Sequence, residues 1–326
     1  MQIAPYAGHE READAIVAAW NAAMGESFPL DARLWRQNTD DDPHHDPGGL
    51  FVAREGETCV GFVRARVARV PLGLQPSPPG RGWISAIAVA PTHQRRGVGR
   101  QLLQRAEMWL RKQGAREVRL GGDPGHFFPG VPSTQSAGRA FFEATGYTAV
   151  GDVCFDLAAD IEGFRVPALV DRIMSRNLHF RISECSTRTV PALLEFLRQT
   201  FPGRWLYETQ LRLEAERSPQ DIQVLTIGSR VVGFAHTFHN RSRRLGPSVY
   251  WRGLLGPAFG GLGPMGVAAD VRNSGLGYVL LCESVERLRK MGVGRMAIDW
   301  TVLTRFYGAA GFKPWKEYQA FERVLD

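Results

Sequence analysis

Cysteine is scarce in this chain, and long apolar runs are missing from its sequence. The four cysteines among the 326 residues are far apart and in no C-x-x-C spacing: Cys59, Cys154, Cys185 and Cys282. This spacing supports neither a zinc site nor a disulfide framework, so we expect no metal and a reducing compartment. No apolar run reaches about 18 residues, and the first residues do not show the pattern of a signal peptide. A cytoplasmic protein without a membrane span is therefore expected.

Extremes of composition are missing as well. Hydrophobic residues make up 44% and charged residues 22% of the chain, which excludes global disorder and a fibrous array. The net charge of +7 favours anionic partners but does not choose among phosphorylated cofactors, nucleic acid and membrane surfaces. Because the aromatic residues are not interleaved with basic runs, we do not expect nucleic-acid binding. The length predicts two domains.

The most informative motif is a turn that contains two glycines. Residues 94–100 (Gln-Arg-Arg-Gly-Val-Gly-Arg) follow an apolar strand at 83–89 and precede a long amphipathic helix, and a weaker copy lies at 272–277. The start of a helix presents unpaired N–H groups at the positive end of its dipole, so such a turn is an anion site. A Rossmann motif is excluded because Leu102 and Leu280 replace its third glycine.

The two turns belong to an internal repeat. Gly97 and Gly275 are separated by 178 residues, and so are Gly114 and Gly292 at the ends of the following helices. Each half also contains a later aromatic and glycine motif, at 141–147 in the first and at 306–312 in the second. We therefore predict an N-terminal domain at 1–158, a linker at 159–178 and a C-terminal domain at 179–326.

Hydrophobic periodicity predicts alternating helices and strands in both halves, which is the α/β class. In the first half we expect helices at 13–24, 30–37 and 137–144, and strands at 50–54, 59–70, 83–89, 117–120 and up to 157. In the second half we expect helices at 190–199, 206–215 and 303–309, and strands at 180–185, 222–227, 231–238, 262–267 and 297–300.

Both halves resemble the GCN5-related N-acetyltransferase (GNAT) family. The resemblance rests on the order strand, Q/R-x-x-G-x-G/A turn, long helix, strand, and short helix with a final Gly-aromatic pair. It implies two tandem domains, each with a mixed, mostly antiparallel sheet that is splayed for acyl-CoA and flanked by helices. It also implies a monomeric or homodimeric acetyltransferase that uses acetyl-CoA and acetylates the amine of a small molecule or peptide.

The resemblance assigns cofactor-binding positions in each half. In the first half these are the strand edge and the turn, Ile87, Ala88, Val89, Gln94, Arg95, Arg96, Gly97, Val98, Gly99 and Arg100. In the second half they are Met265, Gly266, Val267, Arg272, Asn273, Ser274, Gly275, Leu276, Gly277 and Tyr278. The strand edges would hold the pantetheine arm, and the turns would hold the pyrophosphate.

The catalytic positions differ between the halves. The acid of the family is commonly a tyrosine four residues before the motif glycine, which is Tyr307 in the second half and Phe142 in the first. We therefore expect catalysis in the C-terminal half, with Asp299 either a general base acting through water or a cap or ion-pair residue. Two alternatives stay open: a catalytic N-terminal half without a tyrosine acid, and an acyl-CoA-binding module that does not catalyse.

Two loops of the first half allow more than one interpretation. The acidic run at 40–46 is expected to be solvated, although it could attract a cationic amine or bind a metal. His126, Phe127 and Phe128 could line an acceptor pocket or cap the core.

Overall fold

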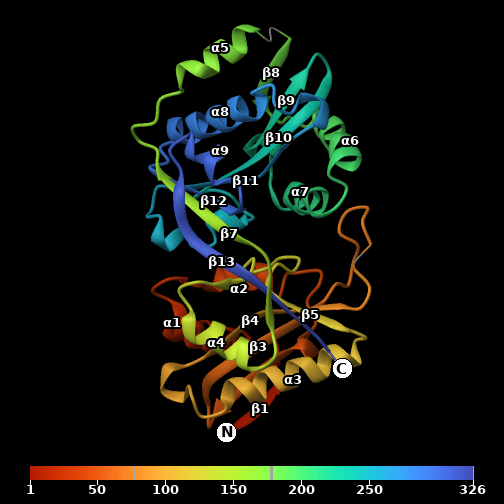
Figure 1. Cartoon of the computed structure of the whole chain (residues 1–326), viewed down its shortest axis with the longest axis vertical. Coiled ribbons are helices and arrows are strands. Elements are labelled where there is room, and N and C mark those ends of the chain that lie inside the picture. Colours follow the sequence, from red (N-terminus) through yellow and green to blue (C-terminus); the bar gives the residue numbers. More distant parts are fainter. Residues whose placement is uncertain (77, 177–178, 326) are drawn as a thin grey trace. The chain divides into compact units, whose positions relative to one another are not determined.

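The computed structural model describes residues 1–76, 78–176 and 179–325, and its contacts divide the chain into two compact units. The first unit contains Met1–Val70, Ser77–Cys154 and Lys316–Asp326, and the second contains Pro71–Pro76 and Phe155–Trp315. Each unit is a mixed sheet with helices on its faces (Figure 1). The fold class expected from the sequence is confirmed.

The first unit is built on a sheet with the strand order β1-β2-β3-β4-β5-β13. Its strands are β1 (Gln2–Pro5), β2 (Leu50–Glu55), β3 (Thr58–Val67), β4 (Arg81–Val89), β5 (Glu117–Leu120), β6 (Val131–Pro132), the first part of β7 (Thr148–Asp160) and most of β13 (Lys313–Val324). Its helices are α1 (Glu10–Met24), α2 (Ala32–Asn38), α3 (Val98–Lys112) and α4 (Ser136–Ala144).

The alternation of side chains along β3 places helices on both faces of this sheet. Phe62 points to one face, where its ring lies 6.1 Å from that of Trp20 on α1 and 5.7 Å from that of Trp35 on α2. Val63 points to the other face and belongs to the core cluster that contains Leu102 and Leu103 of α3. Because successive side chains of a strand point to opposite faces, α3 and the α1–α2 pair cover different sides of the sheet.

The second unit repeats this arrangement with the strand order β7-β12-β11-β10-β9-β8. Its strands are β8 (Phe180–Glu184), β9 (Ile222–Ile227), β10 (Arg230–His239), β11 (Phe259–Val267), β12 (Arg295–Thr301) and the end of β7, and its helices are α5 (Ala168–Arg176), α6 (Val190–Thr200), α7 (Arg204–Ala215), α8 (Leu276–Lys290) and α9 (Thr304–Gly308). Phe234 contacts Trp205 of α7 on one face, while Ala235 packs with Leu280 of α8 on the other.

Both sheets splay at the same point. β4 and β5 are parallel, and their pairing ends at Ile84 and Leu120, although β4 continues to Val89. β11 and β12 are also parallel, and their pairing ends at Leu262 and Ile298, although β11 continues to Val267. In the described part of the chain, no strand pairs with the rest of β4 or of β11 on that side, so each unit presents an open strand edge in the middle of its sheet.

Each unit takes its last strand from the other half of the sequence. Residues 321–324 of β13, at the end of the chain, pair with β5 in the first unit. Residues 155–160 of β7 pair with β12 in the second unit. The sequence patterns predicted neither β13 nor this exchange, because both strands alternate apolar and polar residues and could fit either sheet edge.

The predicted domain boundaries stay a prediction, and residues 177, 178 and 326 lie outside the described part of the chain. The compact units differ from these boundaries, because residues 316–326 pack in the first unit and residues 71–76 in the second. Several element bounds also differ from the prediction: α1 begins at Glu10 and not at 13, and β11 begins at Phe259 and not at 262. The strand expected at 59–70 is β3, which ends at Val67, and the helix expected at 206–215 is α7, which begins at Arg204.

Candidate active site

The glycine turn of the first unit has the geometry of an anion site. Gly97 is the N-cap of α3 with φ +81°, and no side chain caps this helix. Arg95 has φ +59°, and Arg95, Arg96 and Arg100 are all exposed. The Gln94 side chain donates a hydrogen bond of 2.9 Å to the carbonyl oxygen of Val89, which ties the turn to the open strand edge. Exposed N–H groups and guanidinium groups therefore lie together at the positive end of α3.

A cavity of about 850 Å³ joins this turn to the open strand edge. Of the positions predicted to bind acyl-CoA in this half, all except Arg96 and Val98 line the cavity. Val98 is instead buried in the core beneath the turn. The wall opposite the strand includes Phe142, the residue at the place of the family's tyrosine. The size of the cavity and the turn at its mouth fit a long phosphorylated ligand.

The turn of the second unit has the same backbone but fewer free donors. Gly275 is the N-cap of α8 with φ +87°, and Asn273 has φ +62° in the place of Arg95. The Ser274 hydroxyl accepts a hydrogen bond of 3.3 Å from the N–H of Leu276, so one donor of the helix start is already used. Arg272, Asn273 and Ser274 are exposed. This turn is the weaker anion site of the two.

The remaining predicted positions of the second half lie along the same strand edge and helix. Met265, Gly266 and Val267 are partly exposed at the unpaired end of β11. The Tyr278 hydroxyl donates a hydrogen bond of 2.9 Å to the carbonyl oxygen of Ala309, so this side chain links α8 to the end of α9. Leu276 is buried in the core.

Asp299 lies at the splay point of the second sheet, one residue beyond the last pair of β11 and β12. Burial raises its pKa to about 8, the charges of Asp156 and Glu208 add to this, and Arg204 opposes them. Burial and then the charge of Asp299 also raise the pKa of Tyr307 on α9. The structure thus brings together the two residues predicted to be catalytic, and neither is charged at neutral pH in most molecules.

Helix α7 contributes charged side chains beside Asp299 that the sequence reasoning missed. Arg204 Nε lies 2.5 Å from Glu208 Oε1, and its guanidinium lies 4.7 Å from the centre of the Trp300 ring. The backbone N–H of Trp300 donates a hydrogen bond of 3.1 Å to Asp156 Oδ1. A comparison of the two halves at the separation of 178 residues could have drawn attention to 299–300, where the first half has two glycines.

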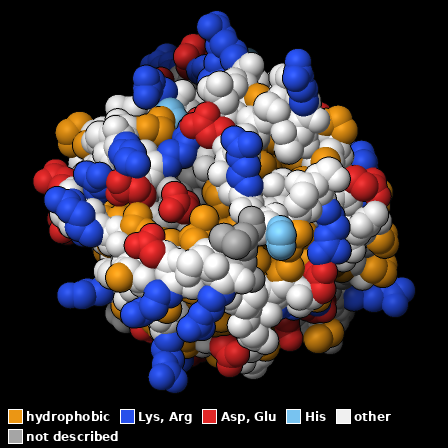
Figure 2. Space-filling model, turned by 90° about the horizontal axis from the view of Figure 1, so that it is seen from above, with side chains coloured by type: hydrophobic (Ala, Val, Ile, Leu, Met, Phe, Trp, Pro, Cys, Tyr) orange, Lys and Arg blue, Asp and Glu red, His pale blue; other side chains and the backbone are white. Residues whose placement is uncertain are grey.

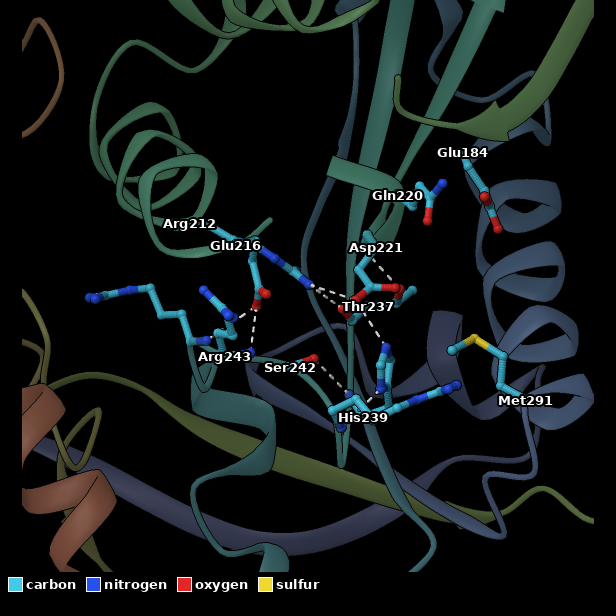
Figure 3. A network of polar contacts seen from close by, with 12 residues as sticks. Glu184, Arg212, Glu216, Gln220, Asp221, Thr237, His239, Ser242, Arg243 and Met291 are labelled. Carbon is cyan, nitrogen blue, oxygen red and sulfur yellow. Dashed lines mark hydrogen bonds and ion pairs between the residues drawn. The ribbon is translucent and has the colours of Figure 1, made fainter. Parts of the chain in front are cut away.

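A buried polar network holds α7 on the second sheet (Figure 3). Arg212 Nη2 donates a hydrogen bond of 2.6 Å to the carbonyl oxygen of Thr237 on β10. Asp221, just before β9, lies 2.9 Å from His239 Nε2 and 3.1 Å from Arg287 Nη2 on α8. Burial lowers the pKa of Arg212 to about 10, and Asp221 opposes this effect. The network positions the helix that carries the charges beside Asp299.

The first unit contains an ion cluster near the splay point of its own sheet, with two arginines and two aspartates. Asp123 Oδ2 lies 2.7 Å from Arg66 Nη1 and accepts a hydrogen bond of 2.7 Å from the Ser85 hydroxyl. Arg66 Nη2 also lies 2.6 Å from Asp42. Burial and the neighbouring Arg66 lower the pKa of Arg64 to about 9. All four charged side chains are buried, so they form a structural cluster beside the cavity.

The acidic run at 40–46 is therefore not simply solvated. Asp42 is buried in the ion cluster, and burial lowers the pKa of His44 to about 4. Asp41 is exposed, as expected. Within the described residues no group of acidic, histidine or cysteine side chains could hold a metal ion.

The three residues at 126–128 belong mainly to the core. His126 and Phe127 are buried. Phe128 is buried too, and its ring stacks 5.4 Å from that of Trp20. Phe128 also lines the cavity, and its role in an acceptor pocket stays a prediction.

Basic side chains are spread over the face shown in Figure 2, and acidic side chains lie among them. No helix in the described part of the chain is long and apolar enough to cross a membrane. The expected cytoplasmic location, oligomeric state and absence of nucleic-acid partners stay predictions.

The splayed sheets are also found in known proteins that are similar to this chain. Residues 15–127 match the model of the acetyltransferase (GNAT) family. No curated protein sequence matches the chain. A solved structure of a glucosamine N-acetyltransferase region, in a fungal multi-domain GH3 β-N-acetylglucosaminidase, is 25% identical with a TM-score of 0.87. The match covers 99% of this chain but only 38% of that protein.

Two further structures match over nearly their whole length. A GCN5-related N-acetyltransferase from Sphaerobacter thermophilus is 16% identical, with a TM-score of 0.67 and coverage of 99% of this chain and 95% of that one. A tandem GNAT protein from the clavulanic acid biosynthesis pathway is 16% identical, with a TM-score of 0.65 and coverage of 99% and 98%. The fold is that of an acyl-CoA-dependent acyltransferase. Residues 15–127 thus match the GNAT family, and the whole chain has the fold of a tandem GNAT protein.

Proposed function

We propose that this chain transfers the acetyl group of acetyl-CoA to an amine, that the second unit catalyses the transfer, and that the first unit binds acyl-CoA. The observation that carries the proposal is Asp299, a carboxyl group at the splay point of the second sheet whose pKa is raised to about 8. A general base works best when its pKa is close to the working pH. An ordinary surface aspartate has a pKa of about 3.9 and would be a much weaker base.

The transfer needs one base and one acid. Ionised Asp299 takes a proton from the acceptor ammonium, and the neutral nitrogen then attacks the carbonyl carbon of the thioester. When the carbon–sulfur bond breaks, the thiolate takes the proton of the Tyr307 hydroxyl. Because burial raises its pKa, Tyr307 keeps that proton at neutral pH until the thiolate forms. The nitrogen loses its second proton as the amide forms, and this proton reprotonates Tyr307, while Asp299 returns its own proton to water.

The first unit lacks both groups at the matching positions. The residue after the last β4–β5 pair is Gly121, and Phe142 stands where the second half has Tyr307. Its nearby carboxylate, Asp123, is buried, and its Oδ2 accepts hydrogen bonds from Arg66 and Ser85. This unit does have the better turn and the cavity, so we assign it the binding of acyl-CoA.

The acceptor that we propose is a small amino sugar. The 25% identical relative is named as a glucosamine N-acetyltransferase region, and its match extends over nearly the whole of this chain. Carboxylates around the splay point suit an acceptor that arrives as an ammonium ion. Other small-molecule amines and peptide amines are the comparison substrates.

One observation favours a second candidate, in which the first unit catalyses. The cavity of about 850 Å³ lies in that unit, and Ser85 and Gly121 are among its lining residues. Transfer there would proceed without a tyrosine acid, and water would reprotonate the thiolate.

Acetyl-CoA-dependent thiol release with glucosamine tests the proposal. We expect Asp299→Asn to lower kcat about 100-fold and Tyr307→Phe to lower it about tenfold, in line with the usual worth of a general base or acid. The exposed Asp270, paired with Arg230, provides the control variant Asp270→Asn, which keeps full activity. Full activity of Asp299→Asn together with lost activity of Gly97→Asp would move catalysis to the first unit. Acetyl-CoA binding without turnover on any amine would instead establish a binding module.

A further inference from the structure

Trp300, the neighbour of Asp299, has a backbone conformation that tryptophan rarely adopts. Among the described residues three that are not glycine have a positive φ, and they are Arg95, Asn273 and Trp300. The first two lie in the glycine turns. Strained backbone of this kind is costly and is concentrated at functional sites. Trp300, with φ +42°, is thus the one outside the turns.

The first half shows that the fold does not need a tryptophan at this place. β5 and β12 have the same register with their parallel neighbours, so Trp300 corresponds to Gly122. Gly122 has φ +68°, which glycine adopts at no steric cost. A tryptophan has replaced the favourable residue in the half that carries Asp299. A gain in binding would explain why the strain is retained.

The surroundings of Trp300 suit a sugar ring that carries an amine. The residue is 36% exposed, so a ligand can reach it from solvent. The guanidinium carbon of Arg204 lies 4.7 Å from the centre of the Trp300 ring, and Asp299 is the residue before Trp300 in the sequence. Carboxylates of Asp156 and Glu208 lie near enough to raise the pKa of Asp299. An aromatic surface beside carboxylates and a guanidinium offers both apolar contact and hydrogen-bond partners for hydroxyl groups.

We infer that Trp300 determines acceptor specificity: its ring stacks on the apolar C–H face of a pyranose ring and places the ring's amine at Asp299. This inference rests on the proposed transfer in the second unit. It deepens that proposal, because the indole selects amines attached to a ring over amines without one.

The test compares glucosamine with ethanolamine, an amine that has no ring face, at saturating acetyl-CoA. Aromatic contacts contribute about 0.5–1.5 kcal/mol beyond burial, so Trp300→Gly is expected to raise KM for glucosamine about 3- to 10-fold. KM for ethanolamine and for acetyl-CoA stays within about twofold. Trp300→Phe keeps an aromatic surface and most of the affinity for glucosamine. Equal changes of KM for both amines, or none, would overturn the inference.

Two controls separate a specificity role from a structural one. Trp109 in the first unit also has an arginine over its ring, with Arg69 at 6.0 Å, and Trp109→Ala should leave both KM values unchanged. Trp300→Gly should fold, because Gly122 adopts the same backbone region.

A failure of the Trp300 inference can be distinguished from a failure of the proposed catalytic function. If Asp299→Asn remains active, the base assignment fails while the two KM values still test Trp300. If wild type turns over neither amine, calorimetry gives the answer: glucosamine binding to wild type that is lost in Trp300→Gly supports the inference, and equal or no binding refutes it.

Discussion

The raised pKa of Asp299 makes the pH dependence of the transfer a demanding test. With a pKa of about 8, roughly a tenth of the Asp299 side chains are ionised at pH 7 and about nine-tenths at pH 9. If the ionised form is the base, kcat/KM rises nearly tenfold for each pH unit below 8 and levels off above it. The measurement is the rate of thiol release with glucosamine between pH 6 and about 10.

The acceptor amine also titrates in this range, so a second variant must identify the group. Asp156→Asn removes a negative charge that raises the pKa of Asp299, and the amide oxygen can still accept the N–H of Trp300. The rising limb should therefore move to lower pH by about 0.5–1 unit. A limb due to the amine alone would not move. An unchanged limb in Asp156→Asn would refute the reasoning.

The raised pKa of Asp299 also makes stability depend on pH. Stability falls as pH rises, whereas activity increases. Because the folded-state pKa of Asp299 is raised above its unfolded value, the folded state binds the proton more tightly, and this group lowers stability as pH rises from about 4 to about 8. A shift of this size corresponds to about 6 kcal/mol, and partial exposure reduces it to the order of 2 kcal/mol. Asp299→Asn should therefore unfold at a higher temperature than wild type at pH 8. An unfolding temperature equal to or below that of wild type would argue against a raised pKa.

Three further predictions concern the first unit. Phe321→Ala should destabilise this unit by about 3–5 kcal/mol, because Phe321 of β13 is fully buried beside β5, and hydrogen exchange should speed up in β5 but not in β12. Arg95→Asn keeps the backbone that Asn273 adopts but removes a charge, so calorimetry should show acetyl-CoA binding weakened about fivefold and less sensitive to salt. An unchanged affinity would remove Arg95 from the site. Gly49→Ala should lower the unfolding temperature, because its Cβ would lie 2.5 Å from the carbonyl oxygen of Ala65, and an unchanged value would contradict this packing.

Local sequence patterns were sufficient to predict the strand and the helix on either side of each glycine turn. A left-handed glycine, a long amphipathic helix and a short apolar strand follow one another within about 30 residues, and each has its own sequence signature. The constant separation of Gly97 and Gly275 then predicted the repeat, which the register of β5 and β12 reproduces. The position of Asp299 at the splay point follows from the same register.

Long-range features escaped the sequence reasoning for physical reasons. The exchange of β13 and β7 depends on which sheet edge a strand joins, and a period of two is the same at either edge. Burial of Asp42 depends on Arg66, which lies 24 residues away and points inward only because of the pleat of β3. The charges of Arg204 and Glu208 beside Asp299 come from α7. This helix is far from Asp299 in the sequence, so no local pattern predicts the contact.

The central claim is that the second unit transfers acetyl groups and uses Asp299 as its base. The most direct measurement is single-turnover acetylation of glucosamine by wild type, Asp299→Asn and the control Asp270→Asn, at equal occupancy of acetyl-CoA checked by calorimetry. We expect Asp299→Asn to bind acetyl-CoA normally but to acetylate about 100-fold more slowly, while Asp270→Asn matches wild type. Acetylation by Asp299→Asn at the wild-type rate would contradict it.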